Sequence, residues 1–308
     1  MSEVDFGRVA VLMGGWSAER EVSLASGRQV LDALVGLGVN AFAVDVERRD
    51  LSHMLVGKCD RVFNILHGTW GEDGRIQGLL EALDIPYTGT GVTGSALTMD
   101  KNLTKAVCQQ QGIATPAWRI VKNAAEFKTA SAEISNEYGY PIVVKPASEG
   151  SSVGVSITRE NELDKAFENA SQYGDVIVEQ FIAGSEITAA ILNDVAMPLI
   201  KISTPREFYD YQAKYQVDST VYECPCGLSV SMEKAIQDTA LGVFKATRCE
   251  AWGRVDFLLD EAGNHYLLEV NTAPGMTDHS LVPMAAAAMG LDFSELVIQI
   301  LKNTVDKH

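Results

Sequence analysis

The chain has 308 residues, of which 46% are hydrophobic and 21% are charged, and its formal net charge at pH 7 is -16. This length is sufficient for roughly two or three domains with substantial cores. The negative charge argues against a nucleic-acid partner, because binding to a phosphate backbone requires a basic surface. The apolar runs are too short to span a membrane and the first residues lack the features of a signal peptide, so we expect a cytoplasmic protein without a membrane partner.

The first part of the chain alternates between strand and helix patterns. Apolar runs at residues 9–13, 41–46 and 61–66 predict buried strands, and helical periodicity predicts helices over residues 22–37 and 74–83. This β-α-β alternation predicts a parallel sheet with right-handed crossovers.

After residue 101 the strand and helix patterns no longer alternate regularly. Residues 205–229 are polar and aromatic with little regularity, and such long irregular stretches are often functional loops or lids. We expect strands at residues 141–145, 176–181, 187–192 and 199–202, and helices at 102–111, 162–170, 232–248 and 292–302.

Residues 253–271 have the pattern of a β-hairpin, with two alternating apolar runs around a polar turn. A symmetric turn places Asp256 opposite Glu269 and Arg254 opposite Asn271, so that both carboxylates and the amide share one face. Facing carboxylates repel each other, and a divalent cation between them would remove the repulsion. Carboxylate and amide oxygens suit Mg²⁺ or Mn²⁺, which commonly also bind phosphates. The alternative is a solvated hairpin face that is acidic by chance.

Two loops follow predicted strands of the parallel sheet, at the edge where α/β proteins bind ligands. The loop that begins at Gly14 lacks the glycine pattern of a dinucleotide site, but Glu19 within it is suited to hold an ammonium group. An ordinary helix start would explain Ser17, but it would not explain the rest of this loop sequence. His67 follows the third predicted strand, although a lone histidine is more often structural than catalytic.

Lys145 ends a predicted strand and precedes a loop rich in glycine and serine, at residues 148–154. Lysine neutralises phosphate charge and backbone amides can hold phosphate oxygens, although the order of residues is not that of a P-loop. A plain hairpin turn would also explain this loop. Glu179 ends one predicted strand and Glu186 begins the next. These carboxylates could contact a ribose or could simply be exposed to solvent, and the sequence is consistent with both interpretations.

These features belong to a series of short motifs in a recognisable order. They lie at residues 14–23, 66–68, 71–74, 87–91, 99–101, 145–154, 208–215, 253–256, 268–272 and 274–280. Taken together, they closely resemble the motifs of the D-alanine–D-alanine ligases of the ATP-grasp superfamily, over nearly the whole chain. Departures from the family pattern are few: Trp16 in the glycine turn, Ala273 where serine is common, and Cys226 in place of a small residue.

The resemblance implies an α/β fold of three domains. It implies a parallel α/β substrate domain over residues 1–100, a central ATP-grasp domain over 101–184, and a C-terminal ATP-grasp domain over 185–308. ATP is expected between the last two domains, and residues 205–229 are expected to form a mobile loop. A homodimer is expected from the resemblance alone.

The resemblance also implies which residues contact ATP and its metal ions. A pair of Mg²⁺ or Mn²⁺ ions is expected on Asp256, Glu269 and Asn271, in agreement with the hairpin pattern. Nucleotide contacts are expected from Lys101, Lys145, Ser151, Ser152, Glu179, Glu186 and Lys214.

The resemblance assigns the remaining site residues to the two amino-acid substrates. Glu19 matches the residue that binds the ammonium group of the first D-alanine, with His67 nearby. Ser151 and Tyr215 are expected to be hydrogen-bonded partners of Glu19. Arg254 and Gly275 are expected around the tetrahedral centre. Ser280 and Leu281 are expected to contact the second D-alanine.

The implied reaction joins two D-alanine molecules through a D-alanyl phosphate, releasing ADP and phosphate, as a step of peptidoglycan precursor synthesis. A ligase with another acceptor such as D-lactate is the alternative, which Tyr215 disfavours. A catalytically silent nucleotide-binding protein is disfavoured by the intact set of predicted site residues, and a nicotinamide-dependent dehydrogenase by the absent glycine pattern.

Overall fold

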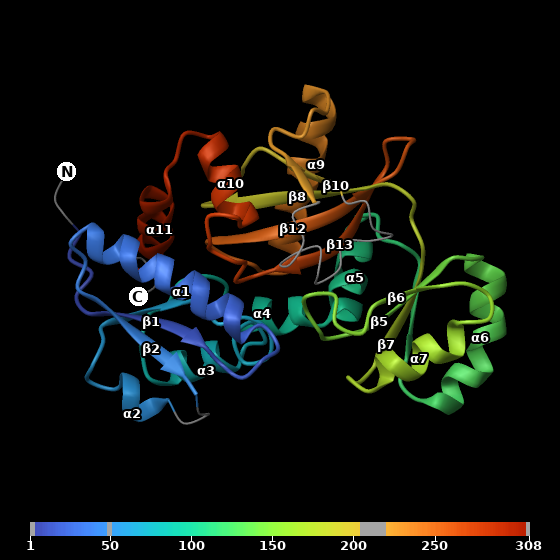
Figure 1. Ribbon diagram of the computed structural model, residues 1–308, viewed down its shortest axis with the longest axis horizontal. Coiled ribbons are helices and arrows are strands. Elements are labelled where there is room, and N and C mark those ends of the chain that lie inside the picture. Colours follow the sequence, from blue (N-terminus) through green and yellow to red (C-terminus); the bar gives the residue numbers. More distant parts are fainter. Residues whose placement is uncertain (1–3, 48–50, 204–219, 306–308) are drawn as a thin grey trace.

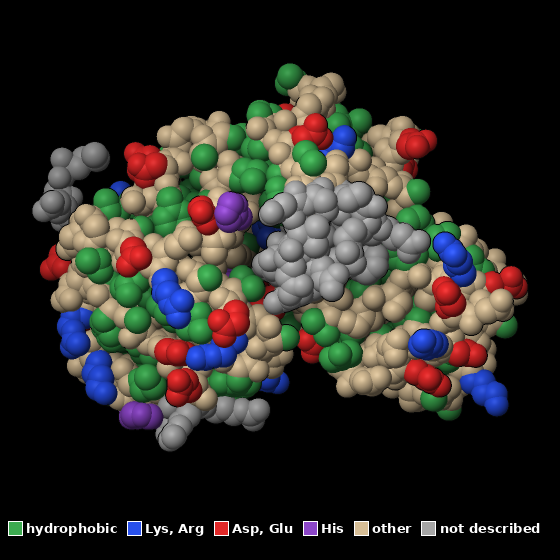
Figure 2. Space-filling view, viewed as in Figure 1, with side chains coloured by type: hydrophobic (Ala, Val, Ile, Leu, Met, Phe, Trp, Pro, Cys, Tyr) green, Lys and Arg blue, Asp and Glu red, His purple; other side chains and the backbone are tan. Residues whose placement is uncertain are grey.

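The structure is a computed structural model that describes residues 4–47, 51–203 and 220–305. Three sheets organise it, one in each of the three lobes visible in Figure 1. Figure 2 shows acidic side chains interspersed with lysines and arginines on the face in view, and a hollow between the lobes of the first and the central sheet.

The first sheet is parallel, with β1 (Val9–Gly14) between β2 (Ala41–Val46) and β3 (Arg61–Asn64). All of β1 is buried, because its side chains alternate between two apolar layers. The predicted β-α-β order is confirmed. The helices of this part are α1 (Arg20–Gly36), α2 (Ser52–Leu55), α3 (Arg75–Ala82) and α4 (Val92–Met99).

The central sheet is antiparallel, in the order β4-β7-β5-β6. Two helices pack on it, and their rings Phe127 and Phe167 stack with centroids 4.2 Å apart. Neither β4 nor α6 was expected from the sequence: β4 has only four residues, and α6 buries only Phe127 and Ile134, which leaves little periodic signal. The elements are β4 (Trp118–Val121), α6 (Ala124–Tyr138), β5 (Ile142–Pro146), β6 (Ser156–Thr158), α7 (Leu163–Ser171) and β7 (Val176–Gln180).

The third sheet contains the predicted hairpin. Asp256 pairs with Glu269 and Arg254 with Asn271, as predicted, but the expected turn symmetry about Ala262 and Gly263 is wrong. Next to the turn Leu259 pairs with His265, and a bulge between Asp256 and Phe257 shifts the register by one residue to give the predicted pairs. Part of the stretch expected to be irregular forms an edge strand, β11 (Val221–Glu223). The other elements are β8 (Ser185–Leu192), β9 (Val195–Ala196), β10 (Ile200–Ser203), α9 (Val230–Ala246), β12 (Trp252–Leu259) and β13 (His265–Asn271).

The chain returns to the first sheet at its C-terminal end. Helices α10 (Leu281–Ala288) and α11 (Phe293–Lys302) share one buried core with α1 and β1, and Figure 1 shows α11 beside α1. α10 was not expected, because a nearly continuous apolar run has no helical period. No single described helix is long and apolar enough to cross a membrane, and α10 and α11 meet that criterion only as a pair bent by 104°.

A buried ion cluster joins α5 (Lys101–Gln110) to the central sheet. Lys105 is 1% exposed, and its Nζ lies 2.9 Å from Glu179 and 2.6 Å from the Thr115 hydroxyl. Lys145 Nζ lies 2.5 Å from the other Glu179 oxygen. Burial opposes ionisation of Glu179, but the two lysines outweigh it and lower the pKa of the carboxyl. Burial lowers the pKa of Lys105 to about 8, against the attraction of Glu179.

We expect Glu179→Gln to lower the free energy of unfolding at pH 7 by roughly 3–5 kcal/mol, because it leaves two buried lysines without their counterion. The folded-state pKa of Glu179 is depressed, so its stabilisation is present above the unfolded pKa and is lost in acid. The difference between wild type and variant should therefore shrink as the pH falls below about 4. Urea unfolding at several pH values measures it.

The matched control is Glu168→Gln, a change at an exposed position of the neighbouring α7. It should alter the free energy of unfolding by less than about 0.5 kcal/mol. Equal effects of the two substitutions would contradict a special contribution from the buried cluster.

Candidate active site

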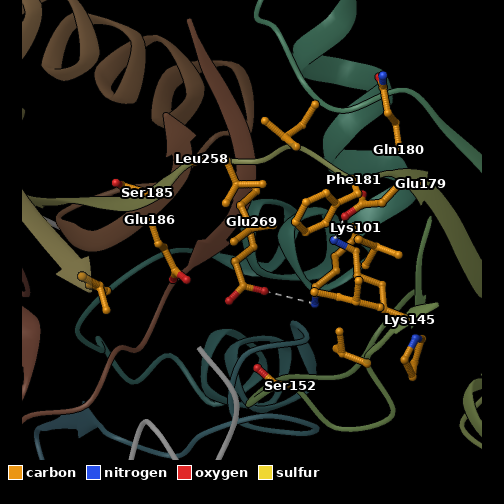
Figure 3. Close-up of a pocket in the computed structure, with 18 of the residues that line it drawn as sticks. Lys101, Lys145, Ser152, Glu179, Gln180, Phe181, Ser185, Glu186, Leu258 and Glu269 are labelled. Carbon is orange, nitrogen blue, oxygen red and sulfur yellow. Dashed lines mark hydrogen bonds and ion pairs between the residues drawn. The ribbon is translucent and has the colours of Figure 1, made fainter. Parts of the chain in front are cut away.

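A cleft of about 360 Å³ lies between the central sheet and the third sheet. Its apolar lining includes Val143 and Ile157 from the central sheet, and Ile202 and Leu258 from the third sheet. These side chains leave a space suited to a flat, weakly polar group. Figure 3 labels the polar lining, with carboxylates and lysines near one another. The predicted nucleotide contacts that line the cleft are Lys101, Lys145, Ser152, Glu179 and Glu186.

Lys101 is placed at one side of this cleft by the start of α5. Asp100 caps the helix by accepting hydrogen bonds from the next backbone N–H groups, at 2.9 and 3.0 Å. The Lys101 Nζ then donates to the Glu149 carbonyl at 2.6 Å and lies 3.4 Å from a Glu269 oxygen. The lysine thus connects the serine-rich loop of the central sheet with the hairpin of the third sheet (Figure 3).

The predicted metal ligands lie together on the hairpin, and their charges are already compensated. Arg254 donates to both oxygens of Asp256, at 2.8 and 2.9 Å, and the Asn271 amide nitrogen donates to the same carboxylate at 2.9 Å. Thr188, in the adjacent strand β8, also donates to Asp256. Glu269 has Lys101 as its ion-pair partner. Cations of the protein therefore reduce the repulsion that the sequence predicted between the facing carboxylates.

The donor set fits a divalent cation in its chemistry. It contains two carboxylates and one amide, all oxygen donors from adjacent positions of one hairpin, which is the class of ligand that Mg²⁺ and Mn²⁺ take. No group of three or more His, Cys, Asp or Glu side chains suited to a metal ion occurs within the described ranges, so a site here would depend on Asn271 and on phosphate oxygens.

Glu19 occupies a narrow space between two loops of different sheets. Ser151, in the loop after β5, donates its hydroxyl hydrogen to the Glu19 carboxylate. A Cβ atom at Gly68 would lie 2.8 Å from Glu19 Oε2 and one at Gly150 would lie 3.0 Å from it, so both positions favour glycine. Ser151 and Ser152 have φ values of 49° and 59°, a left-handed conformation that is uncommon for non-glycine residues and that recurs at turns and at active sites.

His67 lies next to this carboxylate and is 5% exposed. Burial lowers the pKa of His67, while the charge of Glu19 and a hydrogen bond with the Ala273 backbone act in the opposite direction. Its Nε2 is buried and has no hydrogen-bond partner within the described part of the chain. Trp16, the unexpected residue of the glycine turn, packs edge-on against Trp70 with centroids 5.1 Å apart and supports the same loop.

The segment after β13 completes the site. The Ser280 hydroxyl accepts a hydrogen bond from the Thr277 backbone at 2.9 Å, and a Cβ at Gly275 would lie 3.0 Å from that hydroxyl. Leu281 follows as the first residue of α10. The Met276 N–H donates to Ser26 of α1 at 3.0 Å, so this segment is fixed to the first sheet's lobe.

Two polar residues of this region were not assigned a role from the sequence. Lys105 lies one helical turn after Lys101, and that spacing was the available signal. Glu72 accepts hydrogen bonds from the N–H groups of Gly68 at 2.7 Å and Ala273 at 3.1 Å. Burial, and then the charge of Glu19, raise the pKa of Glu72 to about 8.

Two predicted site residues, Lys214 and Tyr215, lie outside the described residues. Of the expected loop over residues 205–229, the structure describes the part from Thr220 onwards.

Comparison with known proteins identifies the family of this chain. Residues 43–90 match the family model for the D-ala D-ala ligase N-terminus, and residues 107–302 match that for the D-ala D-ala ligase C-terminus. A D-alanine–D-alanine ligase of Pseudomonas fluorescens (strain Pf0-1) is 51% identical over 304 residues, covering 98% of this chain and 93% of the relative.

Solved structures agree with this assignment. A crystal structure of D-alanine–D-alanine ligase from Bacillus anthracis has a TM-score of 0.85 and 35% identity, and covers 97% of each chain. A crystal structure of the enzyme from the same organism complexed with ATP has a TM-score of 0.83 and 31% identity, again covering 97% of each chain. The matches extend over all three sheets and both parts of the site. The chain belongs to the D-alanine–D-alanine ligase family of the ATP-grasp superfamily.

Proposed function

We propose that this chain joins two D-alanine molecules into D-alanyl-D-alanine, with ATP converted to ADP and phosphate. The observation that carries this proposal is the adjacency of two compartments. Ser151 bonds to the confined carboxylate of Glu19, while the next residue, Ser152, lines the cleft between the sheets. An amino acid on Glu19 would thus lie beside the phosphate end of a nucleotide in the cleft.

The cleft would hold ATP with its base among the apolar side chains. Lys101 and Lys145 would neutralise phosphate charge, as positioned cations do in phosphoryl transfer. Glu186, which lines the cleft from β8, would accept hydrogen bonds from the ribose, and Glu179 would lie on the adenine side. Lys105 keeps Glu179 paired even when Lys145 turns towards phosphate.

The first D-alanine would place its ammonium group on Glu19 and its carboxylate towards the cleft. That carboxylate attacks the γ-phosphate of ATP, forming the D-alanyl phosphate and ADP. Arg254 and the Gly275 backbone would then stabilise the oxyanion that develops at the acyl carbon. Arg254 lies in β12, and Gly275 lies in the segment after β13.

The second D-alanine would bind at the beginning of α10. The positive end of the helix dipole and the groups at Ser280 and Leu281 suit its carboxylate. Its amine attacks the acyl carbon, phosphate leaves, and the peptide bond remains. Acyl phosphates hydrolyse in water, so the residues 205–229, with Lys214 and Tyr215, are proposed to close over the site.

Asp256, Glu269 and Asn271 would hold the divalent cations of the reaction. When bound, Mg²⁺ or Mn²⁺ would neutralise negative charge on the phosphates. The protein's contribution is to hold the oxygen donors in register on β12 and β13, with Arg254 orienting Asp256.

The remaining features of the proposal concern the context of the enzyme. We propose that the three sheets belong to domains over residues 1–100, 101–184 and 185–308, that the protein acts as a homodimer, and that it supplies peptidoglycan precursors in the cytoplasm. Family membership supports these features.

The first test compares phosphate release from ATP and Mg²⁺ with D-alanine, L-alanine, D-alanine plus D-lactate, or no amino acid. We expect release only where D-alanine is present, with D-alanyl-D-alanine as the product. An ester product in the presence of D-lactate would instead support the alternative acceptor. Retained ATP binding without release under any condition would support a catalytically silent nucleotide-binding protein.

Replacing Glu19 tests the ammonium site. Glu19→Gln keeps the size of the side chain and removes its charge, so we expect kcat/KM for D-alanine to fall roughly 100-fold or more, with little change in ATP affinity. Steady-state kinetics and calorimetric ATP titration measure these quantities. A parallel loss of ATP affinity would show that the substitution disturbs the cleft as well.

Replacing Asp256 tests the proposed metal ligands. We expect phosphate release to stop with EDTA and return with Mg²⁺, and Asp256→Asn to raise the Mg²⁺ concentration for half-maximal activity roughly 10-fold or more. Asp260→Asn, a change in the exposed turn of the same hairpin, is the matched control and should leave this concentration unchanged. Equal Mg²⁺ requirements for all three proteins would argue against a metal site on β12.

A further inference from the structure

We propose that Glu72 is a positioning residue that holds the two halves of the first amino-acid site at a fixed separation. One half is the loop carrying His67 and Gly68, beside Glu19. The other is the segment after β13, which contains Ala273 and leads to Gly275. This inference rests on the proposed function, because it concerns how that site is assembled.

The evidence is a single side chain that spans both halves. Glu72 Oε2 accepts the Gly68 N–H at 2.7 Å, and Oε1 accepts the Ala273 N–H at 3.1 Å. The two donors are 205 positions apart in sequence, and both residues are buried. Since each oxygen has a backbone donor, the carboxylate acts as a bridge between the first sheet's lobe and the third sheet's lobe.

The neighbours of Glu72 give this bridge a direct relation to the substrate groups. Gly68 donates to Glu72 through its N–H, and a Cβ atom added at Gly68 would lie 2.8 Å from Glu19 Oε2, so a side chain there would displace the Glu19 carboxylate. Ala273 is also hydrogen-bonded to the His67 ring through its backbone. The charged or titratable groups that act on Glu72 are Glu19 and Arg254, both proposed to contact the reacting amino acid.

The reaction needs such a bridge because one small molecule must contact both halves. The ammonium group of D-alanine binds Glu19, and its carboxyl carbon must meet Arg254 and Gly275. A displacement of about 1 Å between groups that position a substrate can lower the rate roughly 100-fold. The bond from the Met276 N–H to Ser26 also ties the segment after β13 to the first sheet's lobe, but it reaches α1 and not the loop of His67 and Gly68. Glu72 joins that loop directly to Ala273.

The test compares Glu72→Gln with Asp73→Asn in the full-length protein. Asp73 is the adjacent carboxylate and also accepts two backbone N–H groups, at 2.9 and 3.1 Å, but its donors are near it in sequence: Trp70 in the same loop and Arg75 at the start of α3. The two variants therefore remove similar hydrogen bonds to backbone N–H groups, and only Glu72→Gln removes the bridge.

Hydrogen exchange measures the bridge without relying on activity. In Glu72→Gln the amide nitrogen faces one of the two donors, so we expect peptides covering residues 66–70 and 271–275 to exchange roughly 10-fold faster. In Asp73→Asn only the loop peptide should change. Unchanged exchange of the 271–275 peptide in Glu72→Gln would overturn the proposal.

Kinetics measure the consequence of the bridge. We expect Glu72→Gln to lower kcat/KM for D-alanine roughly 10- to 100-fold while KM for ATP stays within about twofold, and Asp73→Asn to change neither. Faster exchange with normal kcat/KM, or equal losses in both variants, would overturn the positioning role. Failure of the wild type to form D-alanyl-D-alanine would count against the proposed function, while hydrogen exchange would still decide whether the bridge exists.

Discussion

The ionised carboxylate of Glu179, enclosed between Lys105 and Lys145, is the constraint on which the nucleotide cleft depends. A lone charge in that position would be costly to bury, and each lysine alone would be costly too. Together they attach α5 to the central sheet and place Lys101, one turn earlier, at the cleft. A strongly acidic protein thereby keeps basic side chains where phosphates are expected, although its surface charge has the opposite sign.

Much of the fold was accessible from the sequence because local periodicity determined it. The existence of the hairpin followed from alternation, and β1 to β3 followed from short apolar runs. The pairs of Asp256 and Arg254 were predicted correctly, but they result from a bulge after Asp256 and not from the symmetric turn on which the prediction rested. The sequence failed where packing replaced periodicity, as in α10, which is apolar on all sides, and α6, which buries only two residues. Glu72 shows a different limit, since its partner Ala273 is 201 residues away and no local pattern reports that contact.

In the hairpin, the sequence predicted that two carboxylates face each other but did not predict which groups of the protein compensate their charge. The sequence showed two facing carboxylates and predicted a cation between them, whereas in the structure Arg254 and Lys101 provide positive charge at the same carboxylates. These two observations are compatible, because a carboxylate proposed to bind a divalent ion must also be stable without that ion. Arg254 also holds Asp256 in one orientation, which is the function of an outer-shell partner in many metal sites.

The left-handed backbone at Ser151 and Ser152 connects the Glu19 site with the cleft between the central and third sheets. Neighbouring residues face different ligands there: one hydroxyl is bonded to the carboxylate of the first sheet's lobe, and the next residue borders the cleft. Because the two serines are consecutive, a proposed ligand that displaced one of them would also displace the other. Binding free energies in the two compartments are then thermodynamically coupled, and by linkage the effect of nucleotide on amino-acid affinity equals the effect of amino acid on nucleotide affinity.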